Sequence, residues 1–116
     1  MIRLSALLLL IAAPALAAPE TGLFHDGAGR CDPGLVGDPT GPVRISPSRL
    51  EAPRGTCTFT GETRISRMDG TSLRDATCRP VGDGEPFETR FFLSFTERGV
   101  TVVSPAWGTW ALGRCP

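Results

Sequence analysis

Hydrophobic and polar residues alternate along most of the chain after residue 42, with the period of two that is typical of a half-buried β-strand. The pattern is clearest in the segment 88–103. Its apolar positions on one face of two successive strands are Phe91, Leu93, Phe95, Val100 and Val102. A short polar loop that ends in Gly99 separates the two strands. The pattern predicts a β-hairpin at the centre of a small sheet, with Gly99 at positive φ as the last loop residue.

Further segments with strand signals lie between turns rich in Gly, Pro and Asp. They cover residues 43–46, 48–51, 56–65, 72–79 and 107–114. The polar stretch 63–79 also fits a short helical turn, and no segment shows a sustained helical repeat. Six or seven strands at a spacing of roughly 8–12 residues are typical of all-β domains. We therefore predict a small antiparallel meander that forms a sandwich or a partly open barrel.

The first 17 residues have a different character from the rest of the chain. Arg3 precedes a mainly apolar run of ten residues, 4–13, and Ala15-Leu16-Ala17 forms a small-x-small cleavage site. These three parts predict a secretory signal peptide over residues 1–17. A run of ten residues is shorter than the roughly 20 that a membrane-spanning helix needs. We expect a product that does not span the membrane after cleavage and is periplasmic or secreted.

The composition of the remaining chain suggests its source and its internal division. Lys, Asn, Gln and Tyr do not occur. Because Lys, Asn and Tyr have A/T-rich codons, this bias suggests a bacterium with a GC-rich genome as the source. Residues 18–42 contain six glycines and four prolines, which predicts an extended arm. The domain organisation is then a signal peptide 1–17, an arm 18–42 and a single β domain 43–116.

Four cysteines, an even number in an exported chain, predict two structural disulfides. Successive cysteines are 26, 21 and 37 residues apart, so neither a zinc site nor a thioredoxin-like motif is indicated. Of the three possible pairings we predict Cys57–Cys78, between neighbouring strands, and Cys31–Cys115. The second pair brackets the β domain and would fix two chain ends.

The order of these features resembles a group of known proteins. A Gly-Arg-Cys near the mature start, two central cysteines and a terminal Gly-Arg-Cys resemble small exported four-cysteine β-proteins of proteobacteria. The residues that carry the resemblance are Cys31, Cys57, Cys78, Trp110, Arg114 and Cys115. The resemblance implies a disulfide-stapled β-fold and brings no activity with it.

Catalytic chemistry has few candidate groups in this chain. His25 is the only histidine, and it lies in the Gly-rich arm, where a solvated loop position is expected. No Gly-x-Ser-x-Gly motif is present, and paired cysteines leave no free thiol. The carboxylates Asp83, Glu85 and Glu88 sit in or beside a Gly-rich loop, as expected of a solvated turn. We expect no catalytic site, no metal and no cofactor, and the alternative is a small periplasmic hydrolase with an unrecognised active site.

Two groups of side chains are candidates for a partner surface. Trp107 and Trp110 are three residues apart, which on a strand predicts opposite faces, one tryptophan in the core and the other partly exposed. An exposed tryptophan can anchor a partner, although simple packing is the alternative. Arginines on neighbouring predicted strands could form an anion-binding face or a mixed solvated face. They are Arg64, Arg67, Arg74 and Arg79.

The functional expectation is an exported, non-enzymatic β module that binds or supports an envelope partner. A protein inhibitor, comparable in role to small periplasmic lysozyme inhibitors, or an accessory factor is a concrete version of it. Removal of Arg3 with the signal peptide leaves 11 Arg against 12 Asp and Glu, a net charge of −1, so no nucleic-acid partner is expected. The residues proposed for the partner surface are Trp107, Trp110, Arg64 and Arg79.

Overall fold

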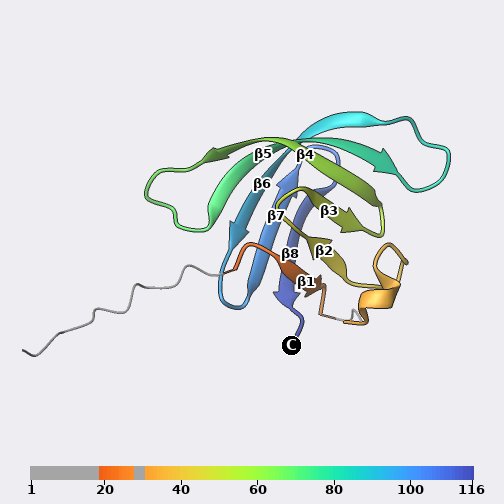
Figure 1. Ribbon diagram of the computed structural model, residues 1–116, viewed down its shortest axis with the longest axis horizontal. Coiled ribbons are helices and arrows are strands. Elements are labelled where there is room, and N and C mark those ends of the chain that lie inside the picture. Colours follow the sequence, from red (N-terminus) through yellow and green to blue (C-terminus); the bar gives the residue numbers. More distant parts are fainter. Residues whose placement is uncertain (1–18, 28–30) are drawn as a thin grey trace, which may run out of the picture.

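Eight strands follow one another around a closed antiparallel barrel, in which each strand pairs with the next and the last returns to the first (Figure 1). The computed structural model describes residues 19–27 and 31–116, so the predicted signal peptide lies outside the described residues. The strands are β1 Gly22–His25, β2 Val43–Ile45, β3 Arg49–Ala52, β4 Gly55–Arg64, β5 Thr71–Pro80, β6 Phe87–Phe95, β7 Gly99–Ser104 and β8 Gly108–Arg114. The all-β antiparallel prediction is confirmed. The expected sandwich or partly open barrel of six or seven strands is replaced by a closed barrel of eight.

Alternate side chains of every strand fill the barrel, because successive residues of a strand point to opposite faces. The predicted β6–β7 hairpin is present, with Phe95 opposite Val100 and Leu93 opposite Val102. The five side chains predicted to face inward are all at most 3% exposed. They pack with inward residues of the other strands into one core. Its largest fully buried members from those strands are Phe24, Ile45 and Leu50.

Gly99 has a different role from the predicted one. It is the first residue of β7 rather than a loop residue, and it is not among the glycines at positive φ. A Cβ added to Gly99 would lie 1.9 Å from the carbonyl oxygen of Leu112 on β8. Close packing between β7 and β8 therefore explains the glycine.

The segment predicted as an extended arm supplies the strand that closes the barrel. β1 pairs with β2 at three positions and with β8 at two, Phe24 opposite Arg114 and His25 opposite Gly113. Between β1 and β2 the chain forms the 3-10 helix η1 over Pro33–Leu35, whose amino end is capped by the side chain of Asp32. The β-barrel thus begins at Gly22 and not at Val43.

The polar stretch for which a helical turn was the alternative is a long β-hairpin. β4 and β5 pair from Gly55 opposite Pro80 to Arg64 opposite Ser72, with one register shift between Phe59 and Gly61. The residues 65–70 form the turn between them. The hairpin is polar because its outward residues face solvent over most of its length.

The structure contains both predicted disulfides. Cys57 and Cys78 lie opposite each other on β4 and β5, fully buried in the barrel, with 3.9 Å between their Cα atoms. Cys31 and Cys115 join the β1–β2 connection to the residue that follows β8. No cysteine is free, and two disulfides are compatible with an oxidising extracellular compartment.

The antiparallel order places the connections at two ends of the barrel. The tryptophan end carries η1, the turn 53–54, the loop 81–86 and the turn 105–107, and the arginine end carries residues 19–21 and the turns 46–48, 65–70 and 96–98. In Figure 1 the loop 81–86 and η1 lie on the right and the turn 65–70 on the left. Among the described residues, no helix has the length and apolar character needed to cross a membrane.

Candidate functional site

The two tryptophans lie together at the tryptophan end, on one side of the barrel. Their ring centroids are 5.6 Å apart and their ring planes differ by only 11°, so the indoles are stacked. Trp107 belongs to the turn before β8, and Trp110 to β8 itself. The prediction of opposite strand faces is therefore wrong, because only one of the two residues is in the strand. Both side chains are half-buried.

Trp107 packs onto the core of the barrel. Its ring centroid is 5.6 Å from that of the fully buried Phe91 and 6.4 Å from that of Phe87. Its backbone N–H donates a hydrogen bond of 3.0 Å to the side-chain oxygen of Ser104, which fixes the turn. Trp107 therefore lies between the core and Trp110, and Trp110 is the member of the stack that lines a cavity.

A cavity of about 700 Å³ opens beside Trp110. It lies where β1, of only four residues, pairs with only the last part of β8, so that among the described residues the first part of β8 is paired with β7 on one side and has no strand partner on the β1 side. Its floor is apolar and comes from barrel residues, and its rim comes from the connections. The lining residues are Phe24, His25, Asp26, Pro39, Thr40, Gly41, Val43, Pro53, Arg54, Trp110, Ala111 and Leu112. We call this cavity the tryptophan pocket.

Arg54 supplies a cation at the rim of the tryptophan pocket. It is exposed in the β3–β4 turn, and its guanidinium carbon lies 5.6 Å from the ring centroid of Trp110. One of its nitrogens also donates a hydrogen bond of 3.4 Å to the carbonyl oxygen of Trp107. The aromatic face and the backbone carbonyl orient the guanidinium without neutralising it, so it can bind an anionic or hydrogen-bond-accepting group.

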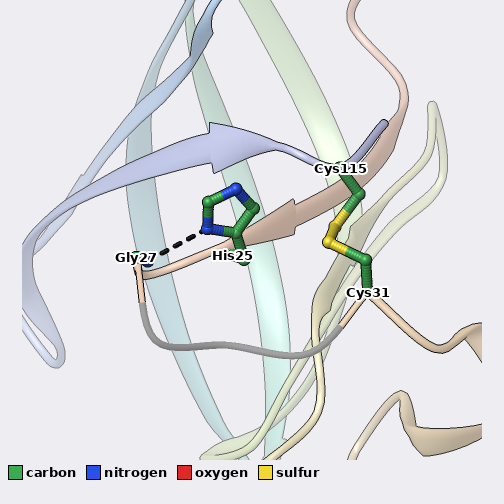
Figure 2. Close-up of a disulfide and its surroundings, with 4 residues drawn as sticks. All are labelled: His25, Gly27, Cys31 and Cys115. Carbon is green, nitrogen blue, oxygen red and sulfur yellow. Dashed lines mark hydrogen bonds between the residues drawn. A yellow bond between two sulfur atoms is a disulfide. The ribbon is translucent and has the colours of Figure 1, made fainter.

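His25 is the last residue of β1 and not a solvated loop residue as predicted. Its ring is half-buried and lies against Gly113, where an added Cβ would be 3.0 Å from Cε1. Nδ1 accepts a hydrogen bond of 3.0 Å from the backbone N–H of Gly27 (Figure 2). Figure 2 also shows the imidazole beside the Cys31–Cys115 disulfide. The hydrogen bond links His25 to Gly27, which follows Asp26, and both His25 and Asp26 line the tryptophan pocket.

The tryptophan pocket has the composition of a binding site. Its volume is within the range of roughly 300–1,000 Å³ that is usual for ligand pockets. Apolar floor residues, one flat indole and a small number of polar groups can hold an apolar or planar group that carries an acceptor. Of the predicted partner residues, only the tryptophans contribute to this region.

The four arginines considered as an anion-binding face or a mixed solvated face do not lie on one surface. Arg79 is exposed near the tryptophan end of β5, and Arg67 lies in the turn 65–70 with a φ of 66°. Arg74 points into the barrel and is buried, whereas Arg64 ends β4 and is exposed. Only Arg64 and Arg74 come together, through a shared carboxylate at the arginine end.

Outside this pair the barrel surface carries mixed charges. Arg90 and Asp75 form a cross-strand ion pair of 2.8 Å, and the hydrogen bond that Arg90 donates to Asp75 raises the pKa of Arg90. The carboxylates Asp83, Glu85 and Glu88 are all exposed. Within the described ranges, no group of three or more His, Cys, Asp or Glu residues could hold a metal ion.

Sequence reasoning missed two residues that the structure brings into contact with the predicted ones. Arg54 follows a proline in a turn of four residues, and nothing in its local pattern distinguishes it from other turn arginines. Glu20 lies in the segment predicted as an arm, and its role depends on the strand β1 that follows it. The sequence signal that could have identified β1 is the apolar pair Leu23-Phe24, which lies between Gly22 and Gly27.

Comparison with known proteins adds no relative: no family model, no curated protein and no solved structure matches this chain.

Proposed function

We propose that this chain is an exported, non-enzymatic β-barrel module that binds a protein partner of the bacterial envelope through the tryptophan pocket. The observation that carries the proposal is the stacked pair Trp107–Trp110 beside a cavity of about 700 Å³. A supported, half-buried tryptophan next to an oriented arginine is the composition typical of interface hot spots.

The chemistry of the pocket describes the partner segment. Arg54 suits a carboxylate or a backbone carbonyl, and the indole of Trp110 suits an apolar or aromatic side chain above it. We therefore expect the partner to insert a loop with an apolar residue next to an acidic one. A protein inhibitor or an accessory factor would both work through such a contact, and the periplasm is the compartment where we place it.

The proposal is tested by capture from periplasmic extract with the mature protein as bait. Trp110→Ala and Arg54→Gln remove the two proposed contacts. Met68→Ala is the matched control, because Met68 is also a large apolar residue, 48% exposed, but lies at the arginine end. We expect one partner to be retained by the wild type and by Met68→Ala and lost by the two pocket variants. Equal capture by all four proteins would contradict the proposal.

A second candidate function is a small hydrolase. The observation that favours it is that His25, Asp26 and Thr40 line the same pocket. The hydroxyl of Thr40 donates a hydrogen bond of 2.8 Å to Asp38, so this hydroxyl already has an acceptor other than His25. Turnover of simple ester or glycoside substrates that is lost in His25→Ala would favour the hydrolase over the binding module.

A further inference from the structure

Arg74 is a charged residue inside the barrel. Its side chain is only 4% exposed, and its guanidinium carbon lies 5.0 Å from the ring centroid of Phe59 and 5.7 Å from that of Phe95. Nε donates a hydrogen bond of 3.2 Å to the hydroxyl of Ser72. The aromatic rings and the hydroxyl fix the plane of the guanidinium near the arginine end.

The guanidinium of Arg74 has fewer partners than its burial requires. One terminal nitrogen lies 3.4 Å from Oε1 of Glu20, which is a long ion pair. The other terminal nitrogen is buried and has no hydrogen-bond partner among the described residues. A buried donor without a partner is unfavourable, and more so in a charged group. A second carboxylate oxygen at this position would satisfy it, since the guanidinium fork matches a carboxylate with two bonds.

Glu20 uses only one of its oxygens for the two arginines. The same Oε1 accepts a hydrogen bond of 2.5 Å from Arg64, and this bond raises the pKa of Arg64. Arg64 also contacts Glu62 at 2.6 Å. Glu20 is therefore bound more closely to the exposed arginine than to the buried one, and it leaves Arg74 incompletely paired.

Glu20 lies outside the strand pairing of the barrel, so its side chain can be displaced without breaking a strand ladder. It precedes β1, and its side chain is 25% exposed. The residues on either side are held by Arg114, which donates hydrogen bonds to the carbonyl oxygens of Pro19 and Thr21. No strand pairing involves residues 19–21.

We propose that Arg74 and Arg64 form a carboxylate-binding site that is occupied by Glu20 of the chain itself, and that a carboxylate from another molecule can replace it. The incoming group would bond the unpartnered nitrogen of Arg74 with its second oxygen. The carboxylate can come from a small molecule or from an acidic side chain of a polypeptide, which share this chemistry. The site lies at the opposite end of the barrel from the tryptophan pocket and does not depend on it.

The test is rescue of Glu20→Ala by an added carboxylate in the full mature chain. Sodium acetate is compared with sodium chloride at equal ionic strength, and the melting temperature is measured. We expect acetate to raise the melting temperature of Glu20→Ala above the value in chloride. The apparent affinity of Glu20→Ala for acetate should be at least tenfold higher than that of the wild type. Glu85→Ala, which removes an exposed glutamate from the loop 81–86, is the control and should behave like the wild type.

Two further measurements locate the bound carboxylate and identify its source. Arg64→Gln combined with Glu20→Ala should reduce the acetate effect at least tenfold, and this exposed arginine can be changed without opening the core. A capped peptide with the sequence of residues 18–22, which contains Glu20, is compared with acetate; tighter binding of the peptide would identify a polypeptide source, and tighter binding of acetate a small molecule. Absence of stabilisation beyond chloride, or an equal acetate effect in the double variant, would overturn the proposal.

Discussion

Trp107 and Trp110 stack with 5.6 Å between their ring centroids, and the two indoles have different neighbours on their other sides. Trp107 contacts the buried core through Phe91, whereas Trp110 lines the tryptophan pocket beneath Arg54. We therefore assign core packing to Trp107 and partner binding to Trp110. The assignment can be tested by replacing each tryptophan in turn.

Trp107→Ala should destabilise the fold more than Trp110→Ala. We expect a loss of about 2–3 kcal/mol in the free energy of unfolding for Trp107→Ala, below the values for a fully buried aromatic residue because its side chain is half-buried. Trp110→Ala loses mainly the stacking contact, worth about 1 kcal/mol. Urea unfolding of the three proteins measures both values. Equal losses, or a larger loss for Trp110→Ala, would contradict the assignment.

His25→Ala should leave both stability and partner capture nearly unchanged. The imidazole packs against Gly113 and accepts one hydrogen bond from Gly27, contacts that are half-exposed and local. A change within about 1 kcal/mol is expected for such a site. The measurements are urea unfolding and capture of the partner by the variant, with Trp110→Ala as the comparison. Loss of capture with retained stability would show that the imidazole of His25 contacts the partner directly, contrary to this prediction.

Gly99→Ala should be among the most destabilising substitutions in the barrel. The added methyl would lie 1.9 Å from the carbonyl oxygen of Leu112, so β7 and β8 must separate. We expect a loss of at least about 3 kcal/mol, as for severe overpacking. Gly82→Ala is the matched control: Gly82 has a φ of 85° in an exposed loop, but nothing lies within 4 Å of its added Cβ. Its cost should be about 1–2 kcal/mol from backbone strain alone, and a similar cost for both variants would refute the packing argument.

Gly99 also shows what a strand pattern can and cannot predict. Alternation located the β6–β7 hairpin and its inward residues, because burial of every second side chain appears directly in the sequence. It could not distinguish a glycine needed for backbone approach from one needed for a turn, since that depends on the neighbouring strand. β1 was missed for a related reason: four residues between glycines and prolines carry too little periodic signal, and only pairing with β2 and β8 makes them a strand.

The contacts within the tryptophan pocket and within the Arg64–Arg74 site also depend on neighbouring elements, so the sequence could not predict them. The tryptophans could be selected as partner candidates by residue type, but their stacking depends on a turn that begins β8 one residue later than predicted. Arg64 and Arg74 could be selected as a possible anion site. Their contact with Glu20 depends on where β1 directs the residues before it, which no local pattern contains.

The two disulfides should differ in what their removal disturbs. Replacement of both Cys57 and Cys78 by Ala removes a cross-link of 21 residues, worth about 3 kcal/mol in chain entropy, and also empties a buried part of the core. Replacement of Cys31 and Cys115 removes a cross-link of 84 residues, worth about 4.5 kcal/mol, but leaves the core filled. Core fluorescence or near-ultraviolet circular dichroism of the folded variants should change only for the first pair. A changed native spectrum for the second pair alone would contradict this distinction.

Glu20 and Arg74 should show strong energetic coupling in a double-mutant cycle. Glu20→Gln removes the one ion pair that Arg74 forms among the described residues, so we expect a loss of about 1–3 kcal/mol in the free energy of unfolding. Arg74→Met replaces the charge by an apolar side chain between Phe59 and Phe95, which for an incompletely paired buried ion is often nearly neutral. In the Arg74→Met background, Glu20→Gln then removes only the contact with the exposed Arg64, and its cost should fall below about 0.5 kcal/mol. Urea unfolding of the four proteins gives the coupling energy, and the Arg64→Gln background serves as the control in which most of the cost remains. An equal cost of Glu20→Gln with and without Arg74 would show that the buried arginine does not depend on this carboxylate.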